Sequence, residues 1–109
     1  MAHDDPAEIA EATEELLVQM LEGNGATSAD LVSLIFTATP DLTSEFPAAA
    51  ARAMGLSEVP LLCAAEIAVP GSLPRCIRVL IHLYTDRDYA SLRHVYLRDA
   101  RGLRSDLEG

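Results

Sequence analysis

Residues 75–83 read Arg-Cys-Ile-Arg-Val-Leu-Ile-His-Leu, and this stretch decides the fold. Apolar side chains recur at every second position from Ile77 to Leu83, which is the period of a β-strand with one covered face. The positions between them place Arg78 and His82 on the opposite face. Because a strand holds its side chains more rigidly than a loop does, Arg78 is expected to be a preorganised cation.

The rest of the chain predicts helices and further strands. Asp5-Pro6-Ala7-Glu8 is typical of a helix start, and apolar residues then recur at three- and four-residue spacing until Gly23-Asn24-Gly25. An alanine-rich segment that stops at Gly55 predicts a second helix. We expect helices over residues 6–22 and 47–54, and strands over 31–37, 59–66, 75–83 and 92–97. Helices interleaved with strands indicate an α+β fold with a mixed β-sheet and helices packed on one face.

Length and apolar content bound the organisation. With 109 residues, the chain is expected to form a single domain over residues 1–109. Half of its residues are hydrophobic, which is generous for a domain with so much surface for its volume. Part of the apolar surface is therefore expected to be buried between subunits, which predicts a homo-oligomer.

The charged residues are divided unevenly. The formal net charge is -9, all eight basic residues are arginines, and none of them precedes Arg52. An acidic chain without a basic face is not expected to bind nucleic acid or an anionic membrane. The acidic N-terminus and the lack of a long apolar run predict a cytoplasmic protein. The grouped arginines suit a ligand with carboxylates, although ordinary surface arginines would give the same composition.

The two cysteines, Cys63 and Cys76, lie in apolar segments, and we expect both to be reduced and buried rather than bridged. A metal site built from these cysteines with His82 and His94 is the alternative. Their spacing matches no zinc pattern, so no metal is expected.

Four polar groups are candidates for a functional site. They are Glu66 at a strand end, with Cys63 three residues before it, Arg78 on a strand face, Tyr96 on the last expected strand and Arg104 in the tail. The chain has no ordered nucleophile and base, no phosphate-binding glycine loop and no cofactor fingerprint. Singly, each group has an ordinary structural explanation as an ion-pair partner, a core tyrosine or a surface acid. Together they suit a reaction that depends on electrostatics and positioning rather than on covalent steps.

Seven blocks follow one another with nearly gap-free spacing: Thr37-Ala38-Thr39-Pro40-Asp41-Leu42, Glu45-Phe46-Pro47-Ala48, Val59-Pro60-Leu61, Cys63-Ala64-Ala65-Glu66, Cys76-Ile77-Arg78-Val79, Arg93-His94-Val95-Tyr96-Leu97 and Leu103-Arg104-Ser105-Asp106-Leu107. In these blocks the chain resembles the monofunctional chorismate mutases of the trimeric mixed α/β class. The resemblance implies a ferredoxin-like or chorismate-mutase-like sheet that assembles into a trimeric pseudo-α/β-barrel, with three sites at subunit interfaces. It also implies that chorismate is rearranged to prephenate without a cofactor, in phenylalanine and tyrosine biosynthesis.

The resemblance also implies a role for each site residue. Arg78 would stabilise the negative charge that develops on the ether oxygen in the transition state. Glu66 and the Cys63 region would hold the ring hydroxyl, and Tyr96 would bind a carboxylate. The segments that approach from a neighbouring subunit or close over the site contribute Phe46, Ala48, Arg52, Leu103 and Arg104.

The chain departs from the family pattern at its N-terminus. The family begins with a strand that supplies another substrate-binding arginine, whereas this sequence starts almost at the first helix cap. We expect loss of that strand to expose a sheet edge or to leave an apolar face uncovered, and to impair catalysis severely. Two alternatives stay open: a non-catalytic trimeric module that binds a small carboxylate, and another trimeric enzyme of similar fold, of the imine-deaminase type.

Overall fold

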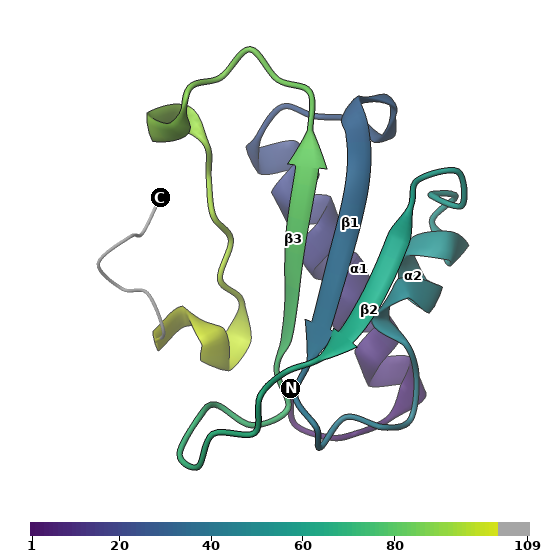
Figure 1. The fold of residues 1–109 in the computed structure, drawn as a ribbon, viewed down its shortest axis with the longest axis vertical. Helices are drawn as coiled ribbons and strands as arrows, with labels where there is room; N and C mark the ends of the chain where they lie inside the picture. The colour runs from purple at the N-terminus through teal and green to yellow at the C-terminus, as the bar shows by residue number, and fades with distance from the viewer. Residues whose placement is uncertain (103–109) are drawn as a thin grey trace.

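The computed structural model describes residues 1–102, in which two helices cover one face of a three-stranded sheet (Figure 1). The helices are α1 (Pro6–Gly23) and α2 (Pro47–Ala53), and the strands are β1 (Leu31–Ala38), β2 (Leu61–Ala65) and β3 (Ile77–Leu83). Short 3-10 turns cover Ser28–Asp30, Tyr89–Ser91 and Arg98–Gly102. The expected α+β class is confirmed, with both helices and the first three strands within about two residues of their predicted bounds.

The first helix begins as its sequence predicts. The Asp5 side chain accepts a hydrogen bond from the backbone N–H of Glu8 at 3.0 Å, and Pro6 occupies the first turn. The Glu8 carboxylate does not close a capping box on Asp5. It accepts instead from the backbone N–H groups of Ala2 at 2.7 Å and His3 at 3.3 Å, so it fixes the segment that leads into the helix.

Strand β1 is the centre of the sheet. It pairs in parallel with β2, which follows it through α2, and antiparallel with β3. Its side chains Leu34 and Phe36 point towards the helices and are almost fully buried. They form the core with Leu17, Ala48, Ala51 and Leu56.

Within residues 1–102, the opposite face of the sheet carries no helix (Figure 1). Ile35 lies in register with Leu62 on β2 and with Leu80 on β3, so an apolar row crosses all three strands. Leu62 and Leu80 are 58% and 55% exposed. Within the expected strand over residues 31–37, only Leu34 and Phe36 are fully buried, because the described chain covers one face of the sheet alone.

The prediction of a strand over residues 92–97 is wrong. This segment passes beyond the outer edge of β3 (Figure 1) but forms no ladder with it, and within residues 1–102 β3 is an edge strand. The segment is anchored to the end of α1 instead. The Arg93 backbone N–H donates to Asn24 Oδ1 at 2.7 Å, and Asn24 Nδ2 donates to the Arg93 carbonyl at 3.0 Å. A strand needs a neighbour as well as a suitable sequence.

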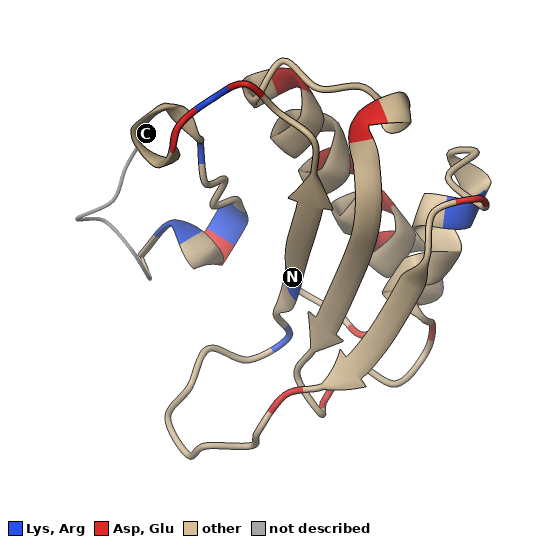
Figure 2. Cartoon of the chain, turned by 45° about the horizontal axis from the view of Figure 1, so that its top comes forward, with Lys and Arg blue, Asp and Glu red and all other residues tan. Residues whose placement is uncertain are grey.

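The charges are distributed as the sequence indicates. Acidic side chains recur along α1, while most arginines gather where the C-terminal part of the described chain passes β3 (Figure 2). Among the described helices, none is long and apolar enough to cross a membrane.

Candidate functional site

Three side chains from three strands meet at one end of the uncovered sheet face. Arg78 on β3 stands opposite Thr37 on β1 in the strand register, and Glu66 directly follows β2. The backbone N–H of Glu66 donates to the carbonyl of Ala38 at 2.9 Å. This hydrogen bond extends the β1–β2 pairing and fixes the backbone position from which the Glu66 side chain projects. The sequence separates these residues by up to 41 positions, and the sheet alone brings them together.

The three polar groups are hydrogen bonded to one another. Arg78 Nε donates to Glu66 Oε1 at 3.1 Å and to Oε2 at 3.2 Å. The Thr37 hydroxyl donates to Glu66 Oε2 at 2.7 Å. The Glu66 side chain is 16% exposed and that of Arg78 is 56% exposed, so the carboxylate is sheltered while the guanidinium reaches outwards.

The outer end of the guanidinium is available for a ligand. Only Nε of Arg78 makes a hydrogen bond to a side chain or backbone group of residues 1–102. The two terminal nitrogens therefore keep their donors, in the planar fork that suits a carboxylate or a developing oxyanion. An ion pair with Glu66 holds the cation in place without using that fork.

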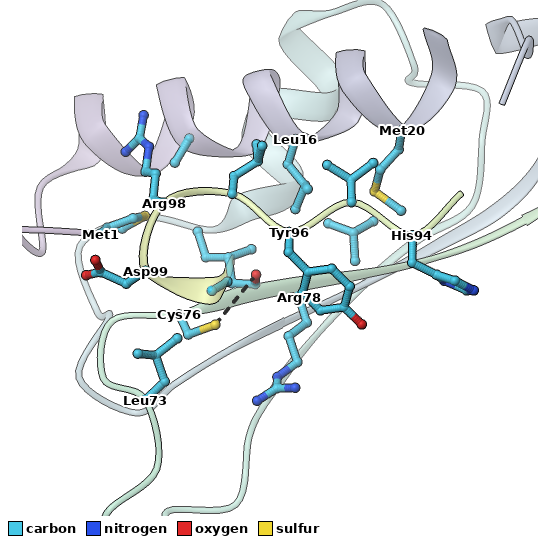
Figure 3. A pocket seen from close by; sticks show the side chains of 16 residues that line it. Met1, Leu16, Met20, Leu73, Cys76, Arg78, His94, Tyr96, Arg98 and Asp99 are labelled. Carbon is cyan, nitrogen blue, oxygen red and sulfur yellow. Dashed lines mark hydrogen bonds between the residues drawn. The ribbon is translucent and has the colours of Figure 1, made fainter. Parts of the chain in front are cut away.

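Tyr96 shares a groove with Arg78. The groove has a volume of about 240 Å³ and lies between β3, α1 and the segment after residue 92. Its walls include Leu16, Met20, Val79, Val95 and Leu97. Figure 3 shows the phenol oxygen of Tyr96 and the guanidinium of Arg78 directed to the same open side. The structure thus brings together a cation and a hydroxyl beside an apolar wall.

Cys76 lies at the inner end of this groove as a free thiol. Burial raises its pKa, and the nearby Arg78 charge only partly offsets that effect. Its Sγ lies 3.9 Å from the carbonyl of Ile77 (Figure 3). A thiol with a raised pKa is a poor nucleophile, so Cys76 is part of the wall rather than a reactive group.

The other residues predicted for the site are dispersed in the single chain. Cys63 is half-buried, packs against the core and lines a second hollow of about 520 Å³ together with Phe46, which is 66% exposed. Ala48 is buried in the core and lines neither hollow. Arg52 is exposed on the last turn of α2 and lines neither hollow. Leu103 and Arg104 lie outside the described residues.

The loop that carries Phe46 is fixed by two carboxylates. Asp4 accepts hydrogen bonds from the backbone and hydroxyl groups of Thr43 and Ser44, at 2.8 to 3.1 Å. The hydroxyl bond from Ser44 is the largest cause of the lowered pKa of Asp4. At the other end of the loop, the Thr39 hydroxyl donates to Asp41 at 2.6 Å and likewise lowers its pKa.

The metal alternative finds no support in the described part of the chain. No group of three or more His, Cys, Asp or Glu side chains there could hold a metal ion. His82 lies on the open sheet face, where its Nδ1 is 3.1 Å from the Ser33 hydroxyl. Cys63 and Cys76 are unbridged, as expected, but only Cys76 is fully buried.

Thr37 is the contact residue that sequence reasoning missed. It falls within an apolar run, where a threonine is an ordinary strand residue. The usable signal was the alternation along β1, which puts Ser33, Ile35 and Thr37 on the face opposite Leu34 and Phe36. The pairing register that sets Thr37 opposite Arg78 was not available from the sequence.

Comparison with known proteins identifies one family. The model of the family described as chorismate mutase type I matches residues 1–107. A chorismate mutase AroH of Thermus thermophilus is 58% identical over 106 residues, which cover 96% of this chain and 87% of that protein. The corresponding protein of Bacillus subtilis is 41% identical over 105 residues, covering 95% and 83%. A solved chorismate mutase structure from Clostridium thermocellum superposes with a TM-score of 0.90 at 47% identity, covering 92% of this chain and 89% of that one.

Proposed function

The chain belongs to the type I chorismate mutase family, and on that premise we propose that it rearranges chorismate to prephenate at the site formed by Arg78 and Glu66. The chain is accordingly an isomerase that serves the biosynthesis of phenylalanine and tyrosine. The observation that supports this site most is the guanidinium of Arg78, held at Nε by Glu66 with its two terminal nitrogens left for a ligand.

Arg78 is the electrostatic catalyst in this proposal. In the pericyclic transition state the ether carbon–oxygen bond breaks as a carbon–carbon bond forms, and negative charge develops on the ether oxygen. A donor that is already fixed in place binds that charge more strongly than it binds the neutral ground state. Loss of one such donor costs about 3 to 4 kcal/mol of transition-state stabilisation.

The neighbouring groups orient the substrate. We assign Glu66 and the backbone around Cys63 to the ring hydroxyl, and Tyr96 to a carboxylate. The chemistry of each group fits its assignment, since a carboxylate accepts a hydrogen bond from a hydroxyl and a phenol donates one to a carboxylate. The rearrangement is intramolecular and requires no cofactor.

We further propose that three chains form a homotrimer with the sites at the interfaces. The apolar row of Ile35, Leu62 and Leu80 supports this, because an uncovered sheet face with large aliphatic side chains is typical of an interaction surface. The dispersal of the predicted site residues supports it too. In a trimer, Phe46, Ala48 and Arg52 would approach Arg78 from a neighbouring subunit, and Leu103 and Arg104 would close over the site.

We place the enzyme in the cytoplasm. Its two cysteines are free thiols, which suits a reducing compartment.

The two other readings of the sequence are less well supported. Both a binding module without turnover and an enzyme of the imine-deaminase type would have to depart from relatives named as chorismate mutases over nearly the whole chain.

The experiment is to incubate the full chain with chorismate and identify the product by nuclear magnetic resonance. Prephenate is expected from the wild type, and from an Arg93→Ala control that removes an exposed arginine side chain. Arg78→Ala is expected to lose nearly all turnover. Chorismate binding without prephenate would favour the binding module, and turnover of an imino acid instead of chorismate would favour the deaminase.

A further inference from the structure

We propose that Thr37 is a positioning residue for this reaction: its hydroxyl orients the Glu66 carboxylate so that Arg78 is held by Nε alone and keeps both terminal nitrogens for the substrate. The inference rests on the proposed role of Arg78 and Glu66, and it assigns Thr37 no direct contact with the substrate.

Thr37 is placed for this role by the sheet. It sits on the central strand, with Ala64 of β2 and Arg78 of β3 as its register partners. The backbone N–H of Glu66 donates a hydrogen bond to the carbonyl of Ala38, the next residue along β1. A β-branched side chain on a strand has few accessible rotamers, so the direction of the hydroxyl is well defined.

The hydrogen bond from Thr37 is the shortest of the three that reach the Glu66 carboxylate from residues 1–102. Thr37 Oγ1 lies 2.7 Å from Glu66 Oε2, whereas Arg78 Nε lies 3.1 and 3.2 Å from the two carboxylate oxygens. A carboxylate can only accept, so the threonine hydroxyl must donate. The distance is that of a hydrogen bond to an ionised partner, in a position where Glu66 is mostly shielded from water.

Removal of this donor has a specific consequence for Arg78. A carboxylate free to turn pairs with arginine in two parallel bonds, and a side-on pair would use Nε and one terminal nitrogen. The cation would still be present, but half of its fork would be unavailable to the developing oxyanion. The effect should therefore appear in kcat, because it concerns a contact that strengthens in the transition state.

The test compares Thr37→Val, which keeps the shape but removes the donor, with Thr37→Ser, which keeps the donor. Thr37→Val is expected to lower kcat on chorismate about tenfold or more, as for loss of a hydrogen bond to a charged group, with little change in KM. Thr37→Ser should retain kcat within about threefold. Thr85→Val, the same substitution in the exposed turn after β3, is the matched control and should leave kcat unchanged.

A double-mutant cycle with Glu66→Ala separates positioning from a general structural role. If Thr37 acts only through Glu66, then Thr37→Val lowers kcat/KM in the wild type but adds nothing in the Glu66→Ala background. If turnover by Glu66→Ala is too slow to measure, the same cycle is read on the inhibition constant of a stable transition-state analogue, which makes the contact that strengthens in the transition state, and the two effects are again expected not to add.

The proposal is overturned if Thr37→Val matches the wild type, if Thr37→Ser is as impaired as Thr37→Val, or if the effects of Thr37→Val and Glu66→Ala are additive. A wild type that does not turn over chorismate contradicts the proposed function itself. An active wild type with an equally active Thr37→Val variant contradicts only the role of Thr37.

Discussion

At the scale of single residues, the main feature is an arginine that is held at Nε by a carboxylate while its terminal nitrogens point outwards. Arg78 Nε donates to the Glu66 carboxylate, and the two terminal nitrogens point outwards. A lysine could not divide its donors in this way, because its ammonium group is a single point on a flexible stem. The alternation of residues 75–83 predicts that Arg78 projects from the face opposite the core, and the structure confirms it.

Tyr96 gives a prediction that separates binding from catalysis. Tyr96→Phe keeps the ring against the groove wall and removes only the hydroxyl assigned to a substrate carboxylate. KM for chorismate should rise about tenfold with kcat little changed, as expected for loss of one hydrogen bond to a charged group made equally in ground and transition states. Steady-state kinetics measure both constants. Tyr89→Phe, at a ring that is 94% exposed, is the control. A fall in kcat at constant KM would assign Tyr96 to the transition state instead.

At the scale of elements, the N-terminal segment holds the loop between β1 and α2. Four hydrogen bonds converge on the Asp4 carboxylate from Thr43 and Ser44, and that loop carries Phe46. Residues 1–5 thus act on a loop some 40 positions away. No sequence pattern predicts this contact, because it joins two polar segments that have no hydrophobic periodicity.

The Asp4 contact predicts a pH dependence. Its lowered pKa, caused chiefly by the Ser44 hydroxyl bond, means that ionised Asp4 stabilises the fold above its usual pKa of 3.8, and that this contribution is lost as the pH falls through the lower, folded-state pKa. Asp4→Asn should therefore reduce the free energy of unfolding at pH 7, and the difference from the wild type should shrink as the solution is acidified below pH 3.8. Urea denaturation across this range measures the difference.

The control for that experiment is Asp86→Asn, in the exposed turn after β3, which should change the free energy of unfolding by less than about 0.5 kcal/mol. A difference between Asp4→Asn and the wild type that stays constant from pH 7 to pH 2 would contradict the role assigned to the ionised carboxylate.

The sequence predicts elements correctly where the pattern is local, and it fails where the structure of a segment depends on contacts with residues far away in the chain. Both helices and the strands β1 to β3 can be predicted from the hydrophobic periodicity of each segment and from the residues that begin and end it. Residues 92–97 have the composition of a strand, yet no strand in residues 1–102 pairs with them. In the same way, Arg78 and Glu66 could be singled out, but their contact and its third member, Thr37, depend on a strand register that only the fold reveals.

At the scale of the whole molecule, the described chain has two layers, a helical layer and a sheet, and one face of the sheet is left uncovered. Both helices cover the same side of the sheet, and the other side leaves Ile35, Leu62 and Leu80 in a row (Figure 1). A homotrimer would cover this face and at the same time bring the dispersed site residues together. Catalysis would then depend on assembly, because a single chain would lack a complete site.

Leu80→Asp tests the coupling of assembly to activity. A carboxylate at the β3 end of the apolar row would have to be buried unpaired in a subunit interface, which costs several kcal/mol, whereas in a monomer it would face water. Sedimentation equilibrium should give three times the chain mass of 11.7 kDa for the wild type and a single chain for the variant. Turnover of chorismate should be lost with assembly. Tyr84→Asp, at another exposed hydrophobic side chain, should leave both unchanged. A trimeric or fully active Leu80→Asp variant would show that this face is not the interface.

The central claim is that the outward fork of Arg78 stabilises the transition state, and the most direct measurement is kcat on chorismate for Arg78→Gln beside Arg93→Gln. The glutamine keeps a polar side chain on β3 but removes the charge and the fork. We predict that kcat of Arg78→Gln falls about 100- to 1,000-fold, the usual cost of losing one preorganised donor, while Arg93→Gln retains the wild-type value. An Arg78→Gln variant with wild-type kcat would contradict the account.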